Sequence, residues 1–119
     1  MQFRRVLLLK PDQLDALNNL AWLLATSPDD TVRNGDEAVQ HAEHACRLTS
    51  FKQSRETGIL AAAYAETGRF QEAIATGELS VKLASAAGDN RSAVVNRQLL
   101  IFYRAGKPWH EPPVAAGGY

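Results

Sequence analysis

Residues 61–80 read AAAYAETGRFQEAIATGELS, and small residues recur along this stretch at helical spacing. Gly68 interrupts the pattern at a place that suits a helix C-cap or a tight turn between two helices. Two antiparallel helices reach the near end of the ~8–10 Å range of interaxial distances only where small side chains meet at their crossing. The stretch therefore predicts a helical hairpin in which Ala61 packs against Ala73.

A hairpin of the same kind precedes this one. Ala21 and Ala38 stand at the matching places, on the two sides of a break at residues 26–36, TSPDDTVRNGD. Alanine is also a good helix former, but helix propensity alone does not predict small residues at matched positions of both hairpins. We therefore expect Ala21 and Ala38 to meet at a second close helix crossing.

Apolar residues keep the helical period along the rest of the chain, and no alternating β pattern competes with it. The last helix is expected to begin near Asp89 and Ser92 and to stop at Gly106, before Pro108. The expected helices span residues 2–9, 12–26, 35–48, 53–67, 70–86 and 90–105. The sequence thus predicts an all-α fold.

Length and composition are those of one soluble globular domain. The chain has 119 residues, of which 45% are hydrophobic and 22% are charged. The 13 Lys and Arg residues balance the 13 Asp and Glu residues, so no long-range positive field gathers phosphate and no nucleic-acid partner is expected. Cys46 is the single cysteine, which excludes an intrachain disulfide. This leaves the localisation open, with a lean towards a reducing compartment such as the cytoplasm.

The first residues resemble the start of a signal peptide, but their apolar run is too short for one. The apolar run at residues 6–9 is interrupted by Lys10 and Pro11, whereas an h-region needs ~7–15 apolar residues. No segment approaches the ~20 apolar residues of a membrane span. We expect neither a signal peptide nor direct membrane insertion within this chain.

The His, Cys and acidic residues do not form a pattern typical of a catalytic or metal site. His41 and His44 lie on one predicted helix with Glu37 and Glu43, but without the H-E-x-x-H spacing or a third ligand. Cys46 shares a helix face with neither histidine, which favours a buried structural thiol over a nucleophile. We expect no metal site, no cofactor and no enzymatic activity.

The two hairpins resemble the tetratricopeptide repeat (TPR) family, whose units of about 34 residues follow the pattern W-x2-L-G-x2-Y, then A, F and P. The second unit is matched by Thr57-x2-Leu60-Ala61-x2-Tyr64, then Gly68, Ala73 and Ser80. Its departures are Thr57 for the first aromatic residue, Gly77 for the second and Ser85 for the closing proline. The first unit is matched by Leu17-x2-Leu20-Ala21-x2-Leu24, then Ala38, Ala42 and Ala45, with a turn several residues too long.

This resemblance implies a short right-handed α-solenoid of about six helices. The expected TPR-like domain spans residues 1–106 and is followed by a Pro/Gly-rich extended tail, 107–119. Its parts are the second helix of an incomplete repeat (1–10), repeat one (11–50), repeat two (51–87) and a C-terminal capping helix (88–106). The ending FYRAGKPWHEPP resembles the ends of large bacterial repeat proteins, some with a membrane glycosyltransferase portion upstream, which implies a C-terminal fragment of such a protein.

In the TPR family the first helix of each unit lines a concave groove. The resemblance places in that groove Asp15, Asn18, Trp22, Arg55, Gly58, Ala62, Glu66, Asn96, Leu100, Tyr103 and Arg104. An apolar floor with polar residues around it suits a peptide anchored by an aromatic contact. The alternative for Trp22 is core packing against the N-terminal helix.

The expected function is therefore that of a protein-interaction scaffold with a peptide or protein ligand. The alternative is a regulatory or targeting appendage of a larger enzyme, such as a glycosyltransferase, with no ligand of its own. A homodimer is also expected, because apolar residues occupy too much of the circumference of helix 2–9 to be buried on one side. The residues of this expected interface are Phe3, Val6, Leu7, Leu8 and Leu9.

Overall fold

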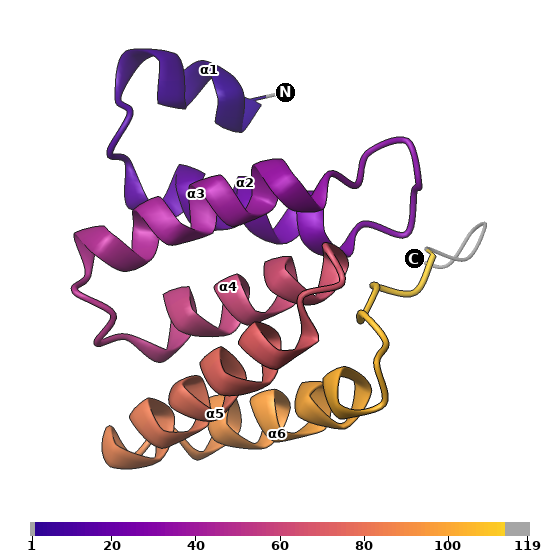
Figure 1. Ribbon diagram of the computed structural model, residues 1–119. Helices are drawn as coiled ribbons and strands as arrows, with labels where there is room; N and C mark the ends of the chain where they lie inside the picture. Colours follow the sequence, from indigo (N-terminus) through magenta and orange to yellow (C-terminus); the bar gives the residue numbers. More distant parts are fainter. Residues whose placement is uncertain (1, 114–119) are drawn as a thin grey trace.

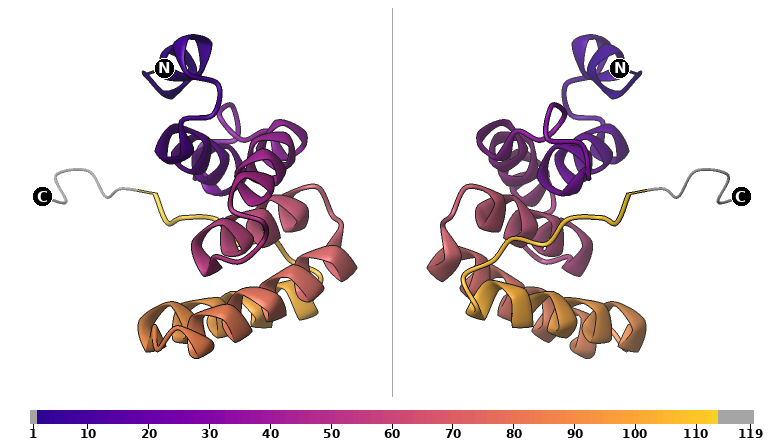
Figure 2. Two further views of the ribbon diagram at one scale, coloured as in Figure 1. Left: turned by 90° about the vertical axis from the view of Figure 1, so that its left-hand side faces the viewer. Right: turned by 90° about the vertical axis from the view of Figure 1, so that its right-hand side faces the viewer.

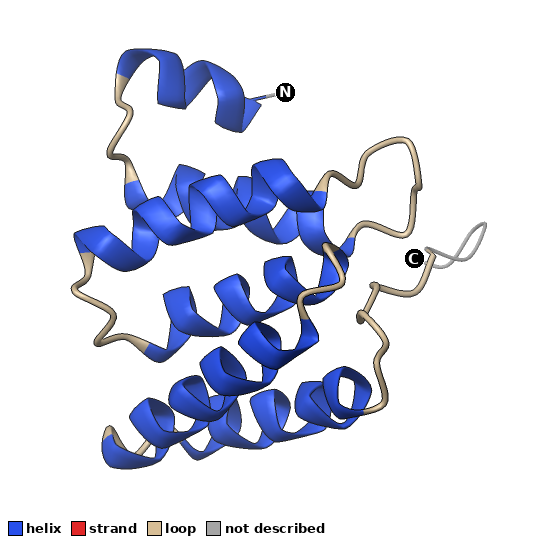
Figure 3. Cartoon of the chain, viewed as in Figure 1, coloured by secondary structure: helices blue, strands red, loops and turns tan. Residues whose placement is uncertain are grey.

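A computed structural model describes residues 2–113 and confirms the all-α fold (Figure 1). Six helices follow one another: α1 (Gln2–Leu9), α2 (Leu14–Thr26), α3 (Gly35–Leu48), α4 (Ser54–Glu66), α5 (Phe70–Ala86) and α6 (Asn90–Arg104). No strand occurs between residues 2 and 113 (Figure 3). Each helix begins and ends within two residues of its expected position. Of the expected tail, residues 114–119 lie outside the described part.

Local signals set the helix ends. Asp89 accepts hydrogen bonds from the backbone N–H of Ser92 (3.1 Å) and from the Ser92 hydroxyl (2.6 Å), which caps the start of α6. These bonds hold the pKa of the Asp89 carboxyl below its usual value. Gly68 and Gly106 follow α4 and α6 with φ of 80° and 72°, in the left-handed region that glycine adopts without strain. The turn and the helix stop expected at these glycines are confirmed.

The helices pack in hairpins along the chain. Helix α2 packs on α3, and α4 packs on α5, while α3 also packs on α4 and α5 on α6. Alternate helices contact one another as well, α2 with α4 and α4 with α6, and we call these three the first helices. Helix α1 stands at one end of the stack, where it packs on α2 and where its Arg4 pairs with Glu37 of α3 (Figure 1). This arrangement is consistent with a helical repeat.

The alanines of the two predicted crossings are buried. Ala21, Ala38, Ala61 and Ala73 are each at most 1% exposed. Ala61 faces α5, because a Cβ placed on Gly77 would lie 3.8 Å from the Ala61 Cβ. Small residues thus stand where α4 meets α5, as the close-crossing argument requires.

Gly77 occupies the place of the second aromatic residue in the TPR pattern, and the structure gives a reason for the departure. A Cβ on Gly77 would lie 2.8 Å from Cδ2 of Leu100, closer than such atoms can approach. The buried Leu100 side chain of α6 fills the space that an aromatic ring would take. Glycine at this position lets α6 pack closely on α5.

Candidate functional site

A hollow of about 180 Å³ opens between the first helices α2, α4 and α6, and we call it the groove. Its lining comprises Trp22 of α2, then Ser54, Arg55, Gly58 and Ile59 of α4, then Ser92, Val95, Asn96 and Leu99 of α6. Apolar side chains of Trp22, Ile59 and Val95 are partly exposed in it, and polar groups of Arg55 and Asn96 stand beside them. Such a surface can bury an apolar side chain and orient it with polar contacts.

Several of the expected groove residues come together here. Trp22, Arg55, Gly58 and Asn96 all line the groove. Asp15 stands beside it, where its carboxylate accepts a hydrogen bond of 2.9 Å from Arg55. Both side chains of this pair are more than half exposed, so Arg55 remains open to a competing carboxylate.

Four expected groove residues are instead core residues. Asn18, Ala62, Leu100 and Tyr103 are at most 3% exposed. The amide of Asn18 donates to buried Glu56 of α4 (2.5 Å), so it serves the α2–α4 contact. The Tyr103 hydroxyl has no hydrogen-bond partner among residues 2–113, and burial raises its pKa. The physical reason is that these positions face neighbouring helices: Asn18 faces Glu56 of α4, and Leu100 faces Gly77 of α5.

The expected apolar floor consisted of Trp22, Ala62, Leu100 and Tyr103. Of these only Trp22 lines the groove, and Ile59, Val95 and Leu99 supply the rest of its apolar lining. The sequence held a signal for part of it. The α6 lining residues Ser92, Val95, Asn96 and Leu99 follow the spacing i, i+3, i+4, i+7 of one helix face. Arg104, also expected in the groove, donates instead to Glu78 of α5 (3.0 Å).

The segment 107–113 leaves α6 after Gly106 and runs back over the first helices to α2 (Figure 2). Its Trp109 ring packs on Trp22 with a centroid distance of 5.8 Å and an interplanar angle of 33°. The indole N–H of Trp22 donates to the Glu111 carboxylate (2.9 Å), and the Glu111 backbone N–H donates to the carbonyl of Thr26 (2.7 Å). Trp22 is therefore covered on one side by the tail.

Neither of the two expectations for Trp22 describes it fully. Its side chain is half-buried and lines the groove on the side of α4 and α6. It also lines a second hollow of about 250 Å³, together with Phe3 of α1 and Glu111 of the tail. Trp22 thus joins the groove, the N-terminal helix and the tail.

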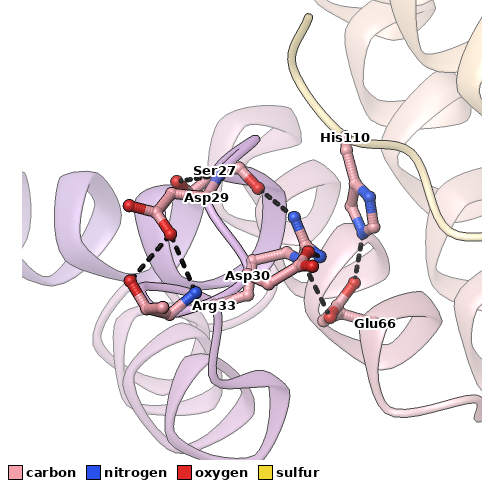
Figure 4. Close-up of polar contacts among 7 residues, drawn as sticks. Ser27, Asp29, Asp30, Arg33, Glu66 and His110 are labelled. Carbon is pink, nitrogen blue, oxygen red and sulfur yellow. Dashed lines mark hydrogen bonds and ion pairs between the residues drawn. The ribbon is translucent and has the colours of Figure 1, made fainter. Parts of the chain in front are cut away.

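Glu66, at the end of α4, faces the tail and not the groove. His110 Nε2 lies 2.6 Å from Glu66 Oε1, while Arg33 Nε lies 3.3 Å from Glu66 Oε2 (Figure 4). Arg33 is itself held by the carbonyl of Ser27 and by the carboxylate of Asp30. Oε2 of Glu66 is therefore paired with Arg33, and Oε1 contacts His110 of the tail.

The long turn between α2 and α3 carries Arg33 to this position. Within it, Asp29 Oδ1 accepts from the backbone N–H (2.9 Å) and the hydroxyl (2.7 Å) of Thr31, which lowers the pKa of Asp29. The Asp29 backbone N–H in turn donates to the Ser27 hydroxyl (3.1 Å). These bonds give the turn, which is longer than the TPR pattern allows, a defined shape (Figure 4).

The histidines and the cysteine of α3 are satisfied within the protein. His41 contacts Glu37 (3.1 Å), and His44 contacts Asp12 (2.8 Å). Cys46 is fully buried, and burial raises the pKa of its thiol to about 12. Within residues 2–113, no group of three or more His, Cys, Asp or Glu side chains is placed to hold a metal ion.

The chain matches no protein-family model, no curated protein and no solved structure. Among the helices that the structure describes, none has the length and apolarity needed to cross a membrane.

Proposed function

We propose that this protein is a TPR-like interaction scaffold that binds a peptide segment of a partner protein in the groove between α2, α4 and α6. The groove itself is the observation that supports the proposal. It opens between three successive first helices and offers a partly exposed apolar floor with polar groups at its rim. The proposal assigns no chemical reaction to the chain.

The groove favours a ligand with an apolar side chain and a nearby carboxylate. Ile59, Val95 and Trp22 provide the apolar contact area. Arg55 provides the cation, because its exposed pair with Asp15 is worth only ~0.2–1 kcal/mol and is easily exchanged for a ligand carboxylate. An apolar anchor buried in a pocket, with polar contacts around it, is the usual source of affinity at such interfaces.

Selection of peptides from a random library on the immobilised full chain tests the proposal. Val95→Glu places a charge on the groove floor and should weaken binding of the selected peptides at least tenfold. Val94→Glu is the matched control, because Val94 is as exposed as Val95 (49% against 46%) on the same helix but does not line the groove. It should leave the affinity within twofold.

Two results would count against the groove. Equal losses from both substitutions would place binding elsewhere or indicate a loss of structure, and circular dichroism of each variant separates these cases. A library that yields no binder would favour the appendage without a ligand of its own.

A further inference from the structure

The tail is seated on the protein as a bound peptide would be. We give the name tail seat to Trp22 and Thr26 of α2 and Glu66 of α4, which contact the tail, and to Arg33 of the α2–α3 turn, which pairs with Glu66. Trp109 packs on the Trp22 ring, His110 contacts the Glu66 carboxylate, and the Glu111 carboxylate accepts a hydrogen bond from the Trp22 indole N–H. The Glu111 backbone adds a fourth contact, to the carbonyl of Thr26.

The contacts alternate along the tail as they do along an extended chain. Trp109 and Glu111 both reach Trp22, whereas His110, between them, reaches Glu66. Successive side chains of an extended peptide point to opposite sides. The seat therefore contacts Trp109 and Glu111 on the side of Trp22, and His110 on the side of Glu66. Pro108 and Pro112 flank the three and restrict the backbone before it binds, which lowers the entropy cost of ordering.

The seat is formed by contacts that do not involve the tail. Arg33 is fixed by Ser27 and Asp30 and itself holds Glu66 (Figure 4). The Thr26 carbonyl belongs to the last turn of α2, where carbonyls lack a partner within the helix. A displaced tail would thus leave a formed site with an acceptor and a carboxylate ready for another segment.

We propose that the tail seat is a peptide-binding site for a partner protein's extended segment carrying an aromatic residue, an imidazole or cationic residue and a carboxylate at three consecutive positions. The chain's own residues 109–111 occupy this site in the absence of the partner. The inference rests on the proposed function, because Trp22 belongs to both the seat and the groove.

A partner segment is favoured over the tail of a second copy. A second copy would make the same contacts as the chain's own tail but would lose the millimolar effective concentration that a short linker provides. A partner segment that continues from the seat past Trp22 into the groove gains contacts with Ile59 and Val95. These additional contacts are what allow it to displace the tail.

The probe for this site is a fluorescently labelled synthetic peptide with the sequence KPWHEPP, residues 107–113. Two proteins are compared: the full wild-type chain and a full-length released variant, Trp109→Ala with Glu111→Ala. The released variant loses the tail's side-chain contacts with Trp22 and keeps all residues of the seat. Fluorescence anisotropy should show saturable binding to the released variant and at least tenfold weaker binding to the wild type.

Substitutions in the peptide test whether the seat recognises all three residues, and they leave the protein itself unchanged. Peptides with Trp→Ala or Glu→Gln at the positions of Trp109 and Glu111 should bind the released variant at least tenfold more weakly. Glu66→Gln in the released variant should also weaken binding of the unchanged peptide. A peptide with the Trp and Glu exchanged should not bind.

Three results would overturn the proposal. The first is no saturable binding to a released variant whose circular dichroism and melting match the wild type. The second is equal binding of the exchanged peptide. The third is a wild-type dimer in light scattering that is lost in the released variant, since it would assign the seat to a second copy's tail. Adding Val95→Glu to the released variant should leave KPWHEPP binding unchanged, so failure of the groove and failure of the seat are distinguishable.

Discussion

Arg33 and Glu66 form an ion pair of 3.3 Å between Nε and Oε2 that joins the α2–α3 turn to the end of α4. Their side chains are only 13% and 17% exposed. An ion pair so shielded from water differs from the exposed pairs of this protein, because removing one partner leaves a poorly solvated charge. The pair therefore fixes the turn, and with it the surface on which the tail lies.

Replacing Arg33 with Met should destabilise the protein by about 1–3 kcal/mol, because Glu66 loses its ion-pair partner while largely shielded from water. Urea denaturation measures the change. Arg104→Met is the matched control, since the Arg104–Glu78 pair is more than half exposed and should contribute under about 1 kcal/mol. Equal effects of the two substitutions would contradict a special role of Arg33.

Replacing Ala61 with Leu should destabilise the protein by roughly 1–3 kcal/mol, because extra volume enters the closely packed α4–α5 contact. Thermal melts measure the change. Ala75→Leu is the control, since Ala75 is an exposed residue of α5 and its substitution adds the same volume to the surface. An unchanged melting midpoint for Ala61→Leu would show that alanine is not required at this crossing.

The helices could be predicted from the sequence because their signals are local. The apolar period of each helix and the turn glycines Gly68 and Gly106 lie within a few residues of the ends they define. The groove floor was harder to predict, since neighbouring positions differ by about 100° around a helix. Even residues three positions apart, which differ by only about 60°, can differ in exposure: Ala62 is buried, while Ile59 lines the groove.

The tail contacts carry no local signal at all. Trp22 and Glu111 are 89 residues apart, and Glu66 and His110 are 44 apart. The sequence predicted an extended tail but not the surface on which it lies, because that surface exists only once three separate elements have packed. The overlong α2–α3 turn was visible as a departure from the TPR pattern, and its role in placing Arg33 appears only in the structure.

The Cys46 thiol should react with a disulfide reagent only when the protein unfolds. Burial removes access and raises the pKa of the thiol to about 12, so little reactive thiolate exists at pH 8. The modification rate should rise with urea in parallel with unfolding followed by circular dichroism. Stoichiometric modification of the native protein within minutes would contradict the buried position.

Acid should release α1 before it unfolds the other helices. Arg4 of α1 pairs with Glu37 of α3, and this pair together with His41 holds the pKa of Glu37 below its usual value. A lowered carboxyl pKa contributes stability above the unfolded value of about 4.3 that is lost as the pH falls through the folded value. Protection of the α1 amides from hydrogen exchange should therefore hold from pH 7 to 5 and be lost first below about pH 4. Glu37→Gln should weaken the protection of the α1 amides already at pH 7.

We predict self-association through α1, whose Leu8 and Leu9 are 83% and 85% exposed while Phe3 and Leu7 pack against the core. Leu8 lines a hollow together with Leu7, Leu20, Arg4, Glu37 and His41, and the exposed side chains of Leu8 and Leu9 offer a second copy an apolar surface to cover. Light scattering across a dilution series should show a dimer in the wild type and a monomer in Leu8→Asp with Leu9→Asp. Ile101→Asp, at an exposed apolar residue of α6, should leave the dimer intact. A wild type that stays monomeric and unaggregated at high concentration would refute the interface.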